Sequence, residues 1–168
     1  VLLQVDRSSG SSPQEERSQF DQYRSGSTMV DSSDASITEL AAIAISTLPR
    51  EASTSERAEA LREAVYPWIS KKRLTTAFAS ASETVRSHEG DCSEHGVLLA
   101  AMLRAEGIPS RVASGLVWMD GLDAFGWHMW TQAFIDGQWI DLDATLSVPF
   151  TVGHILVATS ALEDGDGQ

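Results

Sequence analysis

The segment from Cys92 to Glu106 constrains the fold of this chain more than any other. Its middle, GVLLAAMLRA, is apolar on nearly all sides of a helix, so no face of that helix would suit contact with water. Gly107 and Pro109 then end the helical pattern. We therefore expect this helix to run through the core, with the other elements packed around it.

Three further helices are expected before the central one. Ser33 or Asp34 can cap the first, which runs through ITELAAIAISTL and stops at Pro49. The third lies in FASASETVRSHEG and is expected to close at Gly90.

The second of these helices lies in STSERAEALREAVYPWISKK. Ser53 and Glu56 have the spacing of a capping box, while Leu61 and Val65 lie on one apolar face. Pro67 has no backbone N–H to donate, so it should kink or end the helix.

After the central helix the apolar period changes from that of a helix to two. SRVASGLVWM, WHMWTQAFI and QWIDLDA are typical of strands, and Asp136-Gly137 is a strong signal for a hairpin turn between the last two. HILVATSAL is expected to add an edge strand. Helices followed by antiparallel strands predict an α+β domain.

The chain is expected to contain one compact domain, at residues 34–160. Before it, VLLQV is expected as a strand, and residues 7–33 are rich in Ser, Asp, Gln and Gly, which favours a linker or loosely tied arm. We interpret residues 1–33 as the remnant of an upstream region, because the chain opens on Val rather than Met. Residues 161–168 form an acidic tail.

The net charge of −12 argues against nucleic acid or an anionic membrane as the main partner. No segment approaches the apolar length of a membrane span. The single cysteine excludes an internal disulfide but leaves the compartment open. The sequence does not indicate an oligomeric state.

The only cysteine, Cys92, stands at the start of the central helix. The first turn of a helix has unpaired N–H groups and a partial positive charge, which favour a thiolate and can later hold an oxyanion. Gly90 would let the backbone turn sharply just before it. These features suit a nucleophile, whereas a lone cysteine without further partners would more often be a buried structural residue.

A thiol nucleophile needs a base, and His128 is the candidate. On a strand it shares a face with Trp130, while Asp141 and Asp143 share a face of the neighbouring strand. A histidine opposite a carboxylate on the next strand is a plausible pair of base and orienting group. Either aspartate could serve.

Four other residues near these positions remain open. Trp127 and Trp130 flank His128 and are candidate walls of an acyl-binding groove, although packing would also explain them. His95, one turn beyond Cys92, could be a rival base, although such a residue more often contacts substrate or packs. His88, Cys92 and His95 have spacings that suit a metal, but Gly90 interrupts the helix. We expect no metal and no cofactor.

Four motifs taken together resemble the transglutaminase-like superfamily in its bacterial form. They are Gly-x-Cys in GDC, Gly-Ile-Pro-x-Arg in GIPSR, His-x-Trp in WHMW, and Asp-x-Thr in DAT, which occur in this order. The resemblance spans roughly residues 34–160. The family's Asp-Pro-Thr appears here as Asp143-Ala144-Thr145, which keeps the carboxylate.

The resemblance implies a papain-like fold, with Cys92 as nucleophile, His128 as general base and acid, and Asp143 as the orienting carboxylate. It implies acyl transfer at an amide of a protein or peptide substrate through a thioester. The acceptor can be an amine or water, so transamidation, deamidation and peptide cleavage all stay possible. The alternatives are a cysteine peptidase or amidase without transamidation, and an inactive binding module of the same fold.

Overall fold

The five-stranded sheet contains every expected strand that the structure describes. The computed structural model describes residues 8–11, 20–72, 78–119, 121, 123–148, 150 and 153–165, so the expected strand VLLQV lies outside the described residues. The strands are β1 (Ser8–Ser11), β4 (Ser110–Met119), β5 (Ala124–Ile135), β6 (Gln138–Leu142) and β7 (His154–Ser160). Their order is β1-β6-β5-β4-β7 and each pair is antiparallel, so the edge position expected for β7 is confirmed.

The turn between β5 and β6 is the expected hairpin. Asp136 and Gly137 have φ values of 51° and 84°, the left-handed backbone that a two-residue type I′ turn requires. Ile135 pairs with Gln138 directly across it. This turn fixes the register of β5 against β6, and with it the pairing of Gln132 with Asp141.

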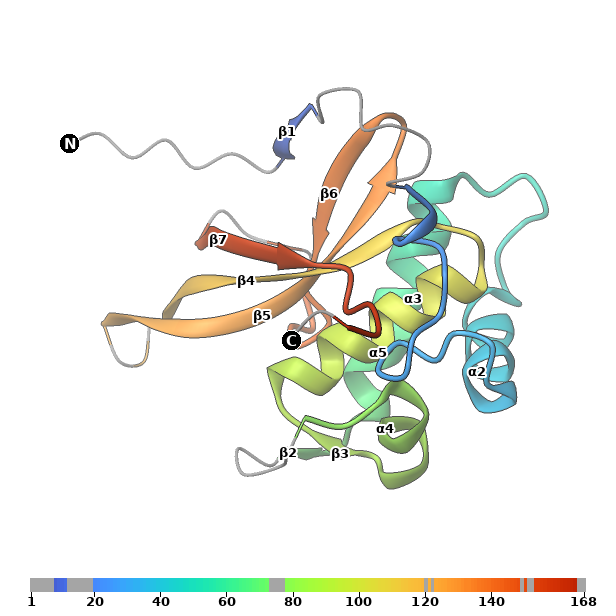
Figure 1. Cartoon of the computed structure of the whole chain (residues 1–168), viewed down its shortest axis with the longest axis horizontal. Helices are drawn as coiled ribbons and strands as arrows, with labels where there is room; N and C mark the ends of the chain where they lie inside the picture. The colour runs from blue at the N-terminus through green and yellow to red at the C-terminus, as the bar shows by residue number, and fades with distance from the viewer. Residues whose placement is uncertain are drawn as a thin grey trace.

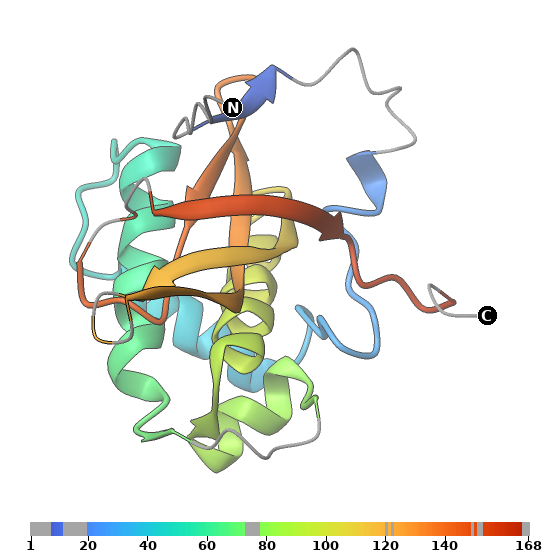
Figure 2. The ribbon, with the colours of Figure 1, turned by 90° about the vertical axis from the view of Figure 1, so that its left-hand side faces the viewer.

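The helices lie on one side of the sheet, as Figures 1 and 2 show. They are α2 (Ala35–Ile45), α3 (Thr54–Trp68), α4 (Ala81–Ser87) and α5 (Cys92–Ala105). A small parallel pair, β2 (Lys71–Lys72) and β3 (Glu89–Gly90), joins the loops below them. Among the described residues, no helix has both the length and the apolar character needed to cross a membrane.

The expected caps of the first two helices are confirmed, but the first helix ends at Ile45, earlier than the stop expected at Pro49. Asp34 accepts the Ser36 N–H at the start of α2. Ser53 and Glu56 form the capping box of α3, with each side chain accepting the other's backbone N–H. Pro67 lies next to the last residue of α3, so the helix ends at this proline as expected.

The central helix α5 is buried from Glu94 to Arg104, which confirms that it runs through the core. Its apolar residues pack against α2, α3 and α4 on one side and against β4 and β5 on the other. Thr131 of β5 donates its hydroxyl to the Gly96 carbonyl at 2.8 Å. A Cβ at Gly96 would lie 3.3 Å from Val112 of β4, so this glycine allows a close approach of helix and sheet.

The end expected for α4 was wrong. The helix ends at Ser87 and is capped by His88, which adopts the left-handed conformation with φ 57°, so Gly90 does not close it. Histidine is one of the residues that enter this region more readily than most. A bond between His88 Nδ1 and the Trp68 carbonyl, 3.0 Å long, holds the side chain there.

Residues 20–33, expected as linker or loose arm, pack on the domain. The Tyr23 carbonyl accepts the Ser110 N–H at 2.8 Å, and Val30 is fully buried. The Phe20 ring lies 4.6 Å from that of Phe134. These apolar residues follow neither helical nor strand periodicity, so pattern alone does not reveal their contacts. The domain boundaries at residues 34 and 160 stay predictions.

Candidate active site

The half-buried Cys92 is the first residue of α5, and the turn before it is tightly built. Asp91 is the N-cap and accepts the Ser93 N–H at 2.9 Å. Glu94 reaches back, and its carboxylate accepts the N–H groups of Asp91 at 2.9 Å and Ala79 at 3.1 Å. A Cβ on Gly90 would lie 2.4 Å from Glu94 Cβ, so glycine is the residue that fits beneath this glutamate. The turn fixes where the sulfur stands.

His128 bonds to Asp143 rather than to Asp141. Its Nε2 lies 2.8 Å from Asp143 Oδ2, and its side chain is 11% exposed whereas that of Asp143 is fully buried. The imidazole also contacts the thiol of Cys92, and this contact acts on its protonation. Thiol, imidazole and carboxylate therefore meet in that order, although they come from α5, β5 and the segment after β6.

The protonation of His128 reflects these two neighbours. Burial lowers the pKa of the imidazole, but the bonds to Asp143 and Cys92 outweigh burial and raise the pKa to about 9. Burial also acts to raise the pKa of Asp143, yet the hydrogen bonds from His128 and His154 lower it below its usual range. The site therefore favours an imidazolium beside an ionised carboxylate at neutral pH.

Each carboxylate oxygen of Asp143 accepts two hydrogen bonds. Oδ2 lies 2.8 Å from His128 Nε2 and 2.9 Å from His154 Nε2. Oδ1 accepts the Thr145 N–H at 2.8 Å and the Thr145 hydroxyl at 2.6 Å. A buried carboxylate is stable only if its lone pairs are satisfied in this way.

Asp141 has a separate set of partners. Its Oδ1 accepts the indole N–H of Trp130 and the amide of Gln132, each at 2.7 Å. Burial raises the pKa of Asp141, and these two bonds act against that rise. Asp141 thus fixes the Trp130 ring, which stacks on the His128 imidazole with centroids 6.2 Å apart.

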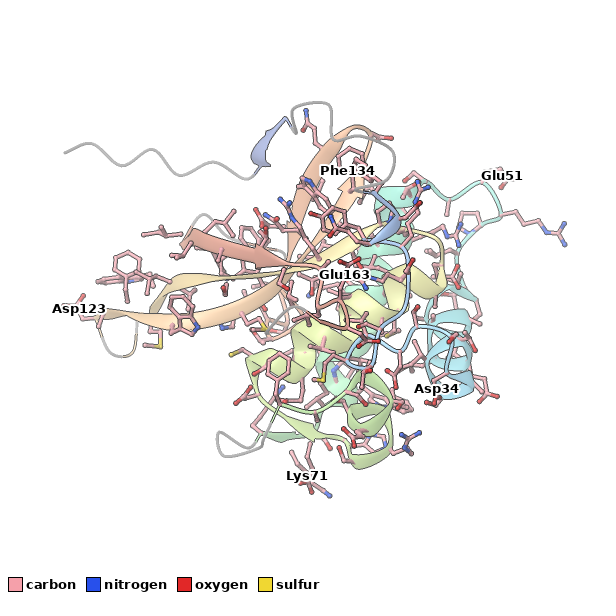
Figure 3. The ribbon with its side chains drawn as sticks, viewed as in Figure 1. Asp34, Glu51, Lys71, Asp123, Phe134 and Glu163 are labelled. Atoms are coloured by element: carbon pink, nitrogen blue, oxygen red, sulfur yellow. The ribbon has the colours of Figure 1, made fainter. Side chains whose placement is uncertain are left out.

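The two tryptophans beside His128 occupy different environments. Trp130 is 1% exposed, so it supports the imidazole from inside the protein and offers no wall to an open groove. Trp127 is 64% exposed and is available to a ligand. Both tryptophans lie on β5. In Figure 3 the labels of Asp123, just before β5, and Phe134, near its end, show where this strand runs.

His95 lies inside the protein, with 1% of its surface exposed. Its Nδ1 bonds to the Asp91 carbonyl, and its Nε2 lies 2.6 Å from Lys72 Nζ. Burial and the nearby Lys72 lower the pKa of His95 to about 4, against the effect of the Asp91 carbonyl. This histidine is therefore neutral at pH 7, and both ring nitrogens already have partners.

Within the described part of the chain, one group of three side chains could hold a metal. The candidate ligand atoms of His128, Asp143 and His154 lie within 4.8 Å of one another. The two hydrogen bonds to Asp143 Oδ2 already account for this closeness. His88, Cys92 and His95, which have metal-like spacing in the sequence, do not form such a group.

The fold is that of papain-like proteins. A model of the transglutaminase-like superfamily matches residues 41–144, more than half of the chain. The chain therefore belongs to the transglutaminase-like superfamily, as the four sequence motifs indicated. No curated protein matches the sequence.

Two solved structures resemble this one. A candidate cysteine protease from Cytophaga hutchinsonii has a TM-score of 0.71 and 23% identity, over 88% of this chain and 48% of that protein. A candidate protease from Parabacteroides distasonis has a TM-score of 0.49 and 18% identity, over 83% of this chain and 29% of that protein. This chain thus spans about half the length of the first protein and a smaller share of the second. The first match confirms the papain-like α+β fold.

The contact of His154 with Asp143 was not predicted from the sequence. It lies 11 residues after Asp143, outside the four motifs, and it reaches the carboxylate because β7 pairs with β4. The signal available in the sequence was a polar residue that opens an otherwise apolar strand, HILV. Such a residue is common at strand ends, so the signal was weak.

Proposed function

We propose that this chain is a thiol enzyme that transfers or hydrolyses the acyl group of an amide through Cys92, His128 and Asp143. The substrate is a protein or peptide, attacked at a glutamine carboxamide or a peptide bond. The observation that carries the proposal is the single contact chain from thiol to imidazole to buried carboxylate. Membership of the superfamily supports the same chemistry.

In the first half of the reaction, the Cys92 thiolate attacks the amide carbon. The C–N bond breaks, the departing nitrogen takes a proton from the His128 imidazolium, and a thioester remains on the sulfur. We assign the developing oxyanion to the N–H of Cys92, since the first helical N–H has no acceptor within the helix.

In the second half, an amine or water attacks the thioester. His128, now neutral, takes the proton of the attacking group, and the C–S bond breaks to release Cys92 as thiolate. Asp143 holds the imidazole in one orientation through both halves, because its bond to Nε2 leaves Nδ1 for the thiol.

The proposal is tested by incubating the protein with glutamine-containing peptides, with and without a primary amine, and by reading the products by mass spectrometry. Amine incorporation indicates transamidation, a gain of one mass unit indicates deamidation, and shortened peptides indicate cleavage. A Cys92→Ala sample is the control for spontaneous deamidation. No product of any kind, from a protein whose Cys92 also lacks enhanced reactivity, would favour the inactive binding module.

Cys92 reactivity provides a test without a substrate. Because the His128 pKa is about 9, the imidazolium persists across neutral pH, and iodoacetamide should alkylate Cys92 rapidly even at pH 6. In His128→Ala the rate should instead rise steeply with pH, as for an ordinary thiol. Because Cys92 is the only cysteine, the label reports on this residue alone.

A further inference from the structure

His154 lies beside the proposed catalytic residues but has no role in the reaction as proposed above. It is the first residue of the edge strand β7, it is 4% exposed, and its Nε2 lies 2.9 Å from Asp143 Oδ2. This is the oxygen that also bonds to His128. One carboxylate oxygen therefore links two imidazoles from two strands.

The aromatic rings around His154 hold it in this orientation. Its ring lies 4.2 Å from that of Phe150 and 5.1 Å, edge-on, from that of Trp130. The Trp130 indole is itself fixed by Asp141. Burying an imidazole costs free energy that an apolar side chain of similar size would not. The presence of histidine here therefore suggests that its bond to Asp143 has a function.

The role follows from the geometry of the carboxylate. Asp143 can turn about its side-chain bonds unless donors hold both oxygens, and Thr145 holds only Oδ1. A second donor on Oδ2 holds the other oxygen and directs its remaining lone pair toward His128. The bond from His154 also persists when His128 has given up its proton, the stage at which the attraction between His128 and Asp143 is weakest.

We infer that His154 is a positioning residue, which acts through Asp143 to keep His128 aligned with Cys92. This inference rests on the proposed function. It extends the contact chain to four groups, of which the last is supplied by a strand outside the matched family segment, residues 41–144.

Other titratable groups also face this cluster. Asp141 of β6 interacts electrostatically with His154, His95 of α5 interacts with Asp143, and Cys92 contacts His128. A substitution elsewhere on β7 is therefore the control for the changes at His154. Thr159, exposed on the same strand, provides that control.

The experiment measures alkylation of Cys92 by iodoacetamide from pH 5 to 9, together with thermal unfolding. His154→Leu removes the donor, and we expect alkylation at pH 6 to slow roughly tenfold in the folded protein. His154→Gln keeps an N–H that reaches about as far as Nε2, and it should restore most of the rate. His154→Asn, whose amide is too short, should not restore it. Thr159→Ala should match the wild type.

The outcomes separate this inference from the proposed function. If wild-type Cys92 reacts no faster than a free thiol, the proposed function fails. If the wild type reacts fast and His154→Leu is equally fast, only the inference is overturned. Equal rates for the Gln and Asn variants would also overturn it, since the donor would then not matter. That comparison holds even if the Leu variant does not fold.

Discussion

Asp141 and Asp143 lie two residues apart, yet each holds a different ring beside the thiol. Asp143 bonds to the imidazole of His128, whereas Asp141 bonds to the indole of Trp130. The sequence left open which aspartate orients the histidine. The hydrogen bonds support Asp143 in that role and give Asp141 the task of fixing the ring on which His128 stacks.

The two aspartates should therefore differ when each is replaced by alanine. Asp143→Ala should lower kcat by roughly a hundredfold or more, because His128 loses its orienting partner. Asp141→Ala should lower stability by about 1–3 kcal/mol, since buried donors of Trp130 and Gln132 lose their acceptor, while the folded protein keeps most of its turnover. Peptide turnover and urea unfolding measure both effects. The reverse order of turnover would move the orienting role to Asp141.

Replacing the sulfur should separate activity from folding. Cys92→Ala is expected to abolish product formation, because the sequence contains no other cysteine to form the thioester. The half-buried side chain contributes little volume, so the melting temperature should stay within a few degrees of the wild type. Product analysis and circular dichroism check the two halves. Residual turnover near the wild-type level would exclude Cys92 as nucleophile.

His95 should make the fold sensitive to acid. Its pKa is about 4 in the folded protein and near 6.5 in the unfolded chain, so the unfolded state binds the proton more tightly. The stability that depends on neutral His95 is thus fully present above pH 6.5 and is lost as pH falls toward 4. The loss should amount to about 3 kcal/mol.

The matched variant is His95→Gln, which cannot take up a proton. Urea unfolding at pH 7 and at pH 4 should show a smaller fall in stability for this variant than for the wild type. Asp143 and His128 are present in both proteins, so the difference reports on His95 and its charge interaction with Asp143. An identical fall in the two proteins would contradict a buried, neutral His95.

Trp127 is the residue beside His128 that remains open to a ligand. Trp127→Ala should raise KM for a peptide substrate several-fold with little change in kcat, because truncation removes contact area but no reacting group. Its high exposure predicts almost no change in stability. Trp118→Ala, on the neighbouring strand toward the hairpin tip, is the control and should leave KM unchanged. Equal effects would mean that Trp127 has no special contact with substrate.

Local chemistry explains which features the sequence predicted. The capping box of Ser53 and Glu56, the Asp136-Gly137 turn and the apolar run of α5 each act within a few residues. The approach of His128 to Asp143 was also within reach, because the turn sets the register of the two strands.

Contacts between distant segments were harder to predict. His154 meets Asp143 only because β7 returns beside β4, and Tyr23 meets Ser110 only because residues 20–33 fold over the domain. Neither contact leaves a periodic trace in the sequence. The burial of Trp130 and His95 likewise depends on what covers them, so the sequence suggested substrate contacts at positions that lie inside the protein.

The narrow space opposite His128 restricts how β4 can change. Gly115 pairs with His128, and a Cβ there would lie 2.0 Å from the Ile155 carbonyl and 3.1 Å from the Trp130 ring. Any larger residue would push β7 away from β4, and His154 would move with it. A mutation with no chemistry of its own could thus inactivate the protein at a distance, and screens for loss of activity should recover Gly115 alongside the groups that carry out the reaction.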